Sequence, residues 1–124
     1  MNKQISTGDA PSANHILSQA LVVNDLIFIS GQIHVLPDNT LIEGSTKEKV
    51  TQIFKNIEAI LIAADSTLDA IVKVVIYVTD MAIMPELNEV YPTFFSEIFP
   101  VHEAVCVNSL PLGADIEISV IAAK

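Results

Sequence analysis

The eight consecutive residues from Ile71 to Val78 constrain the fold more than any other part of the sequence. Apart from Lys73 and Tyr77, every residue in this run is apolar and β-branched. Such residues lose side-chain freedom in a helix and pack well on a pleated strand, and the run is too short for a long helix. The run therefore predicts a strand that is buried on both faces and lies centrally in a sheet.

The segment from Thr46 to Ala64 is predicted to be an amphipathic helix, because its apolar residues recur at helical spacing. These residues are Val50, Ile53, Phe54, Ile57, Ile60, Leu61 and Ala64. Ser45, followed three residues later by Glu48, has the form of a capping box, in which each side chain satisfies a backbone N–H that the helix start leaves free. We expect this helix to bury one face.

A second helix is predicted from Pro85, a residue that suits the first turn of a helix. The apolar side of this helix would carry Leu87, Val90, Tyr91, Phe94 and Ile98. Pro92 conflicts with a continuous helix, since an interior proline removes one hydrogen bond and costs ~3 kcal/mol or more. We therefore expect a kink at Pro92 or a later start of the helix.

A β-hairpin is predicted near the amino terminus. The stretches 20–23 and 26–30 are apolar and flank Asn24 and Asp25, residue types that tolerate turn conformations with positive φ. Gly31 is expected to end the second strand of the hairpin. The residues that follow include Pro37 and have the composition of a loop.

Two further strands are predicted at 103–108 and 115–122, separated by a turn at 110–113. The last strand alternates, with Ile116, Ile118, Val120 and Ala122 on one side and Asp115, Glu117 and Ser119 on the other. The resulting order is β-β-α-β-α-β-β. It predicts a single α/β (α+β) domain spanning residues 1–124, with two helices packed on one face of a mixed sheet.

The composition of the chain points to an oligomer. Of 124 residues, 51% are hydrophobic and only 17% are charged, and the mean hydropathy is +0.51. A small monomer of this composition would expose more apolar surface than soluble proteins tolerate. We expect part of that surface to be hidden between subunits.

The charge of the chain opposes nucleic-acid and membrane partners. Arginine is absent, and six lysines face 15 acidic residues, for a net charge of −9. Proteins that hold nucleic acid neutralise phosphates with clustered lysine and arginine, and anionic membranes repel an acidic surface. We therefore expect neither partner.

Several classes of site and location are also disfavoured. Cys106 is the only cysteine, so no intrachain disulfide forms. The three histidines show no metal-ligand spacing, and no nucleotide-binding or triad-hydrolase motif occurs. We therefore expect no metal and no cofactor. Because the sequence has neither a signal-like apolar region nor a membrane-length apolar run, we expect a cytoplasmic protein.

Five residues are candidates for a site, each with a plainer alternative. Gly31 would let a ligand or a backbone come close, although its spacing favours a bulge or a strand-end turn. Glu117 would have a raised pKa if its face of the strand is covered, whereas an open face would leave an ordinary solvated glutamate. His102 is placed for binding but is by default a surface histidine. Asn88 offers a polar contact, and Tyr91 is expected to pack in the core.

Several motifs agree in order and spacing with a known family. They are Ser30-Gly31-Gln32-Ile33, Asn88-Glu89-Val90-Tyr91, Phe94-Phe95, Phe99-Pro100, Leu110-Pro111, Ile116-Glu117-Ile118 and Ile121-Ala122. Over nearly its whole length the chain resembles the Rid family, also called YjgF or endoribonuclease L-PSP. The resemblance implies a chorismate-mutase-like fold, a homotrimer whose sheets form a central barrel, and three clefts between subunits.

The resemblance also implies an activity. Family members hydrolyse reactive 2-imino acids, such as 2-iminobutanoate and 2-iminopropanoate, to 2-keto acids and ammonia without a cofactor. By that likeness, Glu117 would position the attacking water, and Ser30 and Gly31 would hold the imine. Asn88 would lie among the substrate-binding residues.

Three positions of the implied cleft depart from the family pattern. His102 occupies the place of the arginine that grips the substrate carboxylate, Ala104 the place of a frequent cysteine, and Leu17 the place of a tyrosine. A guanidinium offers a planar fork to both carboxylate oxygens, whereas an imidazole does not and is only partly protonated at pH 7. Family subgroups without the arginine generally lack the deaminase activity.

Two functions therefore stay open. The first is an imine deaminase, weakened or not, in which His102 holds the carboxylate and Glu117 directs water. The second is a non-catalytic metabolite-binding or regulatory trimer that uses the same cleft for a less anionic ligand. A ribonuclease or translation inhibitor ranks last, because the chain is acidic and has no arginine.

Overall fold

A mixed six-stranded sheet carries both helices on one of its faces. The computed structural model describes residues 2–96 and 98–124. In chain order, the elements are β1 (Lys3–Ile5), β2 (Ala20–Val23), β3 (Leu26–Ile33), α1 (Thr46–Ala63), β4 (Ile71–Val78), α2 (Met84–Val90), β5 (Val101–Cys106) and β6 (Ile116–Ala123).

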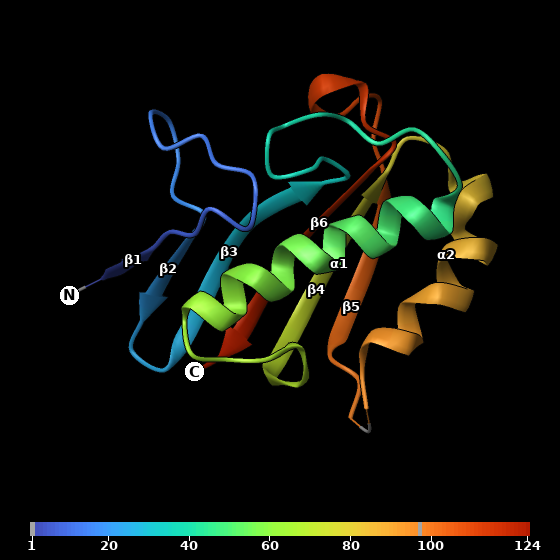
Figure 1. Ribbon diagram of the computed structural model, residues 1–124. Coiled ribbons are helices and arrows are strands. Elements are labelled where there is room, and N and C mark those ends of the chain that lie inside the picture. The colour runs from blue at the N-terminus through green and yellow to red at the C-terminus, as the bar shows by residue number, and fades with distance from the viewer. Residues whose placement is uncertain (1, 97) are drawn as a thin grey trace.

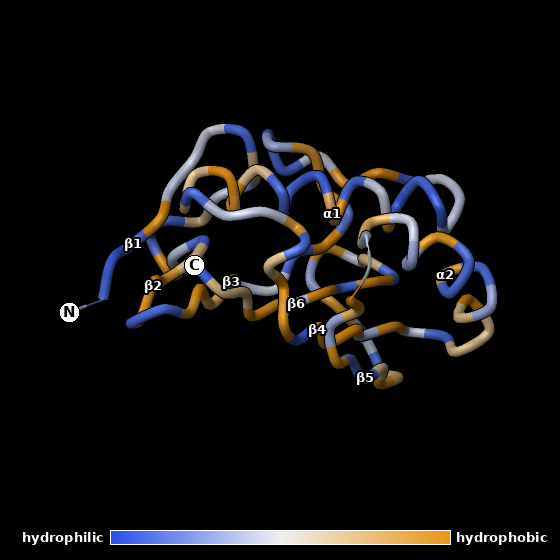
Figure 2. The backbone as a smooth tube through the Cα atoms, turned by 90° about the horizontal axis from the view of Figure 1, so that it is seen from below, coloured by the Kyte–Doolittle hydropathy of each residue, from blue (hydrophilic) through white to orange (hydrophobic). Residues whose placement is uncertain are grey.

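The order of strands in the sheet is β1-β2-β3-β6-β4-β5, and within the described residues only β4 and β5 run parallel. Figure 1 shows α1 and α2 lying across the same side of the sheet. Figure 2, turned by 90°, shows the helices above the layer of strands. The predicted architecture, two helices on one face of a mixed sheet, is confirmed.

β1 is an element that the sequence pattern does not predict. It pairs antiparallel with β2 at the edge of the sheet, and only Ile5 of its three residues is buried. Three residues are too few for an alternating pattern to stand out in a polar segment. This strand therefore forms because it pairs with the edge of β2, and its own composition would not have predicted it.

β2 and β3 form the predicted hairpin, with Asn24 in the left-handed conformation at the turn. The prediction that Gly31 ends the second strand is wrong, because β3 continues to Ile33. A register shift between Ile29 and Gln32 marks a bulge in its pairing with β6. The register with β2 ends at Ile29, so in the described chain the last four residues of β3 have a partner strand only on the β6 side.

α1 confirms the first predicted helix and its capping box. The Ser45 hydroxyl accepts a hydrogen bond from the Glu48 N–H, and the Glu48 carboxylate accepts one from the Ser45 N–H. The helix ends at Ala63, one residue before the predicted end. Its apolar face is buried and consists of Val50, Ile53, Phe54, Ile57, Ile60 and Leu61. Each such side chain contributes about 1.5–3 kcal/mol through burial.

α2 is shorter than predicted, and Pro92 explains why. The α-helix ends at Val90, and Pro92 lies in the single 3₁₀ turn that follows. The expected disruption at Pro92 is thus confirmed. The prediction that Ile98 shares the buried side is wrong, since Ile98 lies beyond the turn and is 86% exposed. Tyr91 does pack in the core, edge-on against Phe54 of α1.

β4 has a strand partner on each side, as predicted. The prediction that it is buried on both faces is wrong for the single chain. Val74, Ile76 and Val78 are buried beneath the helices, whereas Val72 is exposed and Tyr77 is half-buried. The helices cover one face of the sheet only, and the opposite face stays open.

The open face of the sheet is apolar. Its exposed side chains include Leu26, Phe28, Val101 and Val105, which are 40–69% exposed. β5 begins two residues earlier than predicted and runs parallel to β4, and β6 is shifted by one residue from its predicted bounds. A single chain therefore presents the kind of surface that soluble proteins usually cover.

Candidate functional site

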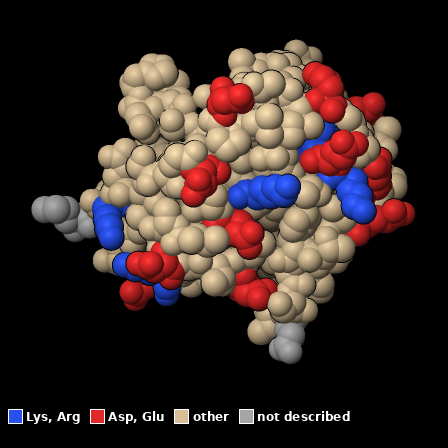
Figure 3. Space-filling model, in the orientation of Figure 1, with Lys and Arg blue, Asp and Glu red and all other residues tan. Residues whose placement is uncertain are grey.

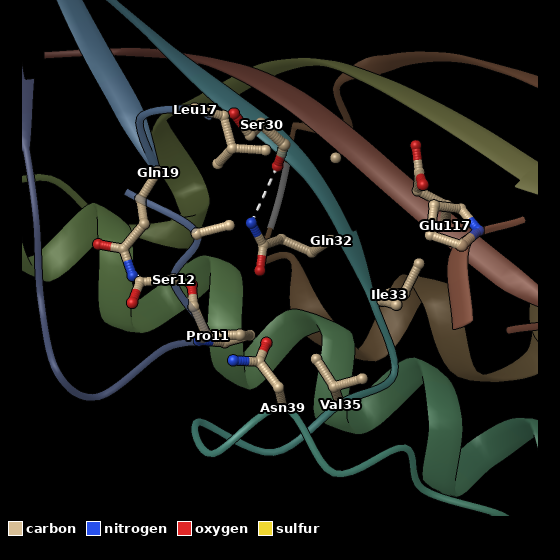
Figure 4. Close-up of a pocket in the computed structure, with 13 residues that line it drawn as sticks. Pro11, Ser12, Leu17, Gln19, Ser30, Gln32, Ile33, Val35, Asn39 and Glu117 are labelled. Carbon is tan, nitrogen blue, oxygen red and sulfur yellow. Dashed lines mark hydrogen bonds between the residues drawn. The ribbon is translucent and has the colours of Figure 1, made fainter. Parts of the chain in front are cut away.

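A cavity of about 200 Å³ lies beside the part of β3 that β2 does not pair with. Its walls come from the amino-terminal segment, the end of β3, the following loop, the turn before β6, and β6 (Figure 4). The lining residues are Pro11, Ser12, Ala13, Leu17, Gln19, Ser30, Gly31, Gln32, Ile33, Val35, Asn39, Pro111 and Glu117. Because small-molecule pockets typically measure about 300–1,000 Å³, this volume fits a site that one chain encloses only in part.

The amino-terminal wall is held in place by the buried amide of Gln19. Its oxygen accepts a hydrogen bond from the Thr7 N–H at 2.7 Å, and its nitrogen donates to the carbonyls of Thr7, Ala10 and Pro11. A buried amide with this many partners fixes an otherwise irregular segment. Leu17, one of the predicted cleft residues, lies in that segment and borders the cavity.

The opposite wall, the loop after β3, is held by the buried side chain of His34. Its Nδ1–H donates to the Ile42 carbonyl at 2.9 Å, and its Nε2 accepts from the Asp115 N–H at 2.9 Å. The imidazole must be neutral to play both roles. Burial is the main reason that the pKa of His34 lies below its usual value. The loop between these contacts carries Asn39 into the cavity wall.

Asp115 belongs to this support and not to the cavity. The prediction that it shares a face of the last strand with Glu117 is wrong, because Asp115 precedes β6 and forms an ion pair with Lys49 of α1. The hydrogen bond from Lys49 is the main reason that the pKa of Asp115 lies below its usual value. The ion pair thus joins the start of β6 to the helix layer.

Glu117 projects from the open face of the sheet into the cavity. It is half-buried, and a Cβ on Gly31 would lie 2.5 Å from its Oε2 atom. Only glycine therefore leaves room for the carboxylate in this position. No hydrogen bond reaches the Glu117 carboxylate from the described residues, and burial raises its pKa. A partly desolvated carboxylate without a partner has the properties of a general base.

Ser30 borders the cavity, but its hydroxyl proton is already engaged. The hydroxyl donates to the Ser18 carbonyl at 2.6 Å, and the Ser30 N–H donates to the Gln19 carbonyl at 2.9 Å. Ser30 therefore ties the amino-terminal segment to β3. Its hydroxyl oxygen can still accept a hydrogen bond from a ligand.

His102, Ala104 and Asn88 lie elsewhere in the chain. His102 and Ala104 are on β5, and Asn88 is exposed on α2. β6 and β4 separate β5 from β3, and three strand spacings correspond to about 14 Å. The single chain brings Glu117, Ser30, Gly31 and Leu17 together around the cavity, and it does not bring His102 to them.

His102 instead packs against an aromatic side chain of the 3₁₀ turn that follows α2. Its ring meets Tyr91 edge-on, with centroids 5.0 Å apart. Tyr91 is buried, as predicted, and burial raises its pKa to about 12. The Tyr91 hydroxyl has no hydrogen-bond partner in the part of the chain that the structure describes. The aromatic contact supports one side of His102 and leaves the residue otherwise exposed.

The cavity has one charged lining residue, Glu117, and no basic one among the residues that line it. In Figure 3 the lysines are scattered among acidic residues and form no basic patch on the visible face. Within residues 2–96 and 98–124, no cluster of three metal-ligating side chains occurs. None of the described helices is long and apolar enough to cross a membrane.

Four polar residues that line the cavity, Ser12, Gln19, Gln32 and Asn39, were not predicted as site residues from the sequence. Gln19 and Gln32 are buried amides, and Asn39 adopts a left-handed conformation in the loop. Gln32 follows the Ser30-Gly31 pair, which is the only signal that could have drawn attention to it. Gln19 and Asn39 carry no such signal, because their roles depend on contacts far along the chain.

Comparisons with known proteins give a consistent result. The sequence model of the family described as Endoribonuclease L-PSP matches residues 7–124. The chain is similar to Protein HMF1 of Saccharomyces cerevisiae, with 46% identity over 115 residues that cover 93% of this chain and 89% of that protein. It is also similar to the 2-iminobutanoate/2-iminopropanoate deaminase of Rattus norvegicus, with 37% identity over 125 residues that cover 100% of this chain and 91% of that protein.

Solved structures agree with the sequence matches. The crystal structure of yeast Mmf1 has a TM-score of 0.97 at 41% identity and covers 100% of this chain and 99% of that chain. E. coli TdcF, whose structure contains bound serine, has a TM-score of 0.92 at 32% identity and covers 98% of each chain. The fold is therefore shared over the whole chain.

Acid is expected to weaken the fold through His34. Its pKa is lower in the folded than in the unfolded chain, so its contribution to stability is complete above the unfolded pKa. That contribution is lost as the pH falls from about 6.5, where the unfolded chain takes up the proton first. Denaturant unfolding should show stability falling between pH 7 and pH 5, and the His34→Gln variant should fall less.

The control for this prediction is His15→Asn, which changes an exposed histidine and should keep the wild-type pH dependence. Glu117 has a raised pKa and acts with the opposite sign, but it is present in all three proteins and cancels in the comparison. Equal pH dependence of wild type and His34→Gln would contradict the assignment.

Gly31→Ala is expected to displace the Glu117 carboxylate and leave the fold intact. The added Cβ meets the flexible end of the Glu117 side chain, which can rotate toward water. The free energy of unfolding should change by less than ~1 kcal/mol, and the pKa of Glu117 should fall toward its usual value. NMR titration of the side-chain carboxyl measures this pKa. An unchanged Glu117 titration would show that the contact with Gly31 does not hold the carboxylate.

Proposed function

The chain belongs to the Endoribonuclease L-PSP family, also called the Rid or YjgF family, and on that basis we propose that it is a homotrimer that hydrolyses small 2-imino acids in clefts between its subunits. The observation that carries the proposal is the Glu117 carboxylate, which lies against Gly31 and receives no hydrogen bond from the described residues. The likeness to the rat deaminase supports the reaction class.

Two features of the single chain support the assembly. The apolar open face of the sheet needs a cover, and the helices lie on the other side. The cavity beside β3 is small, His102 lies on β5 at the far edge of the sheet, and Asn88 lies on α2. A neighbouring copy would cover the open face and bring its own β5 edge to the β3 edge of the first. The cleft would then combine Glu117 of one subunit with His102 of the next.

Glu117 would act on the water that attacks the imine. Water adds to the C2 carbon of the C=N bond as the carboxylate accepts one of its protons, and the proton passes to the nitrogen. Collapse of the resulting carbinolamine breaks the C–N bond, releasing ammonia and the 2-keto acid. Burial raises the pKa of Glu117, which makes its carboxylate a better proton acceptor than an ordinary glutamate. The reaction needs no cofactor.

His102 would receive the substrate carboxylate. An imidazole makes one hydrogen bond where a guanidinium makes two parallel ones, and a charge-assisted bidentate contact is stronger by ~1–2 kcal/mol. We therefore propose slow turnover. Ala104, two residues after His102, is partly buried against the core, and Leu17 gives the cavity an apolar border.

A second candidate function is a metabolite-binding or regulatory trimer without turnover. The observation that favours it is the charge of the cavity, where Glu117 is accompanied by no basic lining residue. Such a cleft suits a less anionic ligand. Loss of the arginine would then reflect a change of ligand rather than a weakened enzyme.

The expected partners follow from the same charge. An acidic homotrimer would bind a small molecule, a 2-imino or 2-keto acid, and would not hold RNA or an anionic membrane. The cytoplasmic location remains a prediction, since one yeast relative, Protein MMF1, is described as mitochondrial.

The homotrimer can be tested by sedimentation equilibrium at micromolar concentration, where the wild type should have three times the mass of the chain. Phe28→Asp places a charge on the open face and should shift the mass toward that of a monomer. Ile62→Asp, at an exposed position on α1, is the matched control and should remain trimeric. A monomeric wild type would remove the inter-subunit cleft.

The proposed reaction can be tested with a dehydratase that generates the imine and a dehydrogenase that reports the keto acid. The wild type should be slow, and His102→Arg should raise the rate roughly tenfold through a charge-assisted contact. Adding Glu117→Gln should abolish the gain. Gln4→Arg adds the same charge on β1 and serves as the control. An inactive His102→Arg variant would favour the binding protein, and a fast wild type would show that His102 replaces arginine adequately.

A further inference from the structure

The end of the cavity that lies beneath the helix layer contains a buried amide with an unused acceptor. Gln32 is only 6% exposed, and the bulge in β3 turns its side chain to the helix side of the sheet. Its nitrogen donates to the Ser30 carbonyl at 3.0 Å. This bond fixes the orientation of the amide, so the oxygen points the opposite way, toward Pro11 and Asn39 (Figure 4).

The Gln32 oxygen has no donor among the described residues. The oxygen is not one of the buried atoms without a partner and keeps access to solvent in the cavity, so a ligand that displaces water from it has to replace that hydrogen bond. Because Gln32 lines the cavity, a molecule in the cavity can supply one. Asn39 also lies near this oxygen, but the presence of an asparagine there is explained without a ligand. Its backbone is left-handed (φ 70°), and asparagine tolerates that conformation.

Charge limits what can bind at this end. Glu117 is the only charged residue that lines the cavity, and it projects from the other face of the sheet. A ligand carboxylate beside Gln32 would meet an acceptor without a compensating cation. A neutral group that donates a hydrogen bond satisfies the amide oxygen without burying a charge.

We propose that Gln32 determines the side-chain specificity of the cleft, selecting amino-acid-derived ligands whose side chain ends in an uncharged hydrogen-bond donor, a hydroxyl or an amide, over aliphatic ones of the same size. The inference rests on the proposed function, because it assumes that the reacting end of the ligand lies at Glu117. Glu117 and Gln32 line the same cavity, so a ligand whose reacting end meets Glu117 can extend its side chain through that cavity toward Gln32.

Homoserine and norvaline test the proposal directly. These amino acids have the same number of heavy atoms and differ only in a terminal hydroxyl or methyl group, and both are stable analogues of the imino acids. Isothermal titration of the wild-type protein should show homoserine binding roughly three- to tenfold more tightly, the value of one neutral hydrogen bond. Gln32→Met keeps the side-chain length and should remove the preference. Gln4→Met makes the same change on exposed β1 and should retain it.

The outcomes separate the specificity from the reaction. Equal affinities in the wild type, tighter binding of norvaline, or no binding of either amino acid would overturn the proposal without reference to any variant. A preference that survives in a folded Gln32→Met protein would remove the assignment to Gln32. If the preference is found but the imine is not hydrolysed, the subsite stands and the proposed reaction fails. If the imine is hydrolysed without a preference, the subsite alone fails.

Discussion

The unequal lengths of β2 and β3 are the constraint on which the candidate site depends. β3 extends four residues beyond its register with β2, which leaves a strand edge that must be covered or capped. The amino-terminal segment, held by Gln19, and the loop held by His34 cover it from two sides. Neither adds a strand, so a cavity remains between them and the edge. The bulge in β3 then sends Gln32 to one face of the sheet and leaves Gly31 open to Glu117 on the other.

The chemistry of this cavity comes from two hydrogen-bond acceptors that receive no hydrogen bond from the described residues. Within the described residues, a half-buried carboxylate lies at its open end without a hydrogen-bond partner, and the oxygen of a largely buried amide faces its inner end without a protein donor. Both groups accept hydrogen bonds, so the cavity favours a ligand that donates them. The residue proposed to receive a ligand carboxylate, His102, lies on the far edge strand. In the proposed homotrimer a second copy would bring that edge to the cavity, and the same contact would cover the apolar face of the sheet.

Much of the fold could be predicted from the sequence, because in those parts the local preferences of the chain agree with the tertiary structure. The capping box and apolar spacing of α1, the hairpin turn at Asn24, and the disruption at Pro92 depend on neighbours within a few residues. The predictions that were wrong depend on distant partners. β1 exists because β2 offers an edge, and β3 passes Gly31 because β6 continues beside it. β4 is half-exposed because no second layer covers the other face of the single chain.

The sequence alone determined which chemical groups are available to this protein. It supplies a glutamate in an apolar strand, a glycine after Ser30, a histidine after Val101, and no guanidinium anywhere. Only the tertiary structure decided which of these groups meet. Glu117 touches Gly31 because β6 pairs with β3, and His102 is remote because β4 and β6 lie between. Residue types and local spacing carry chemistry and short-range geometry, whereas contacts between distant strands depend on register and bulges that no local pattern encodes.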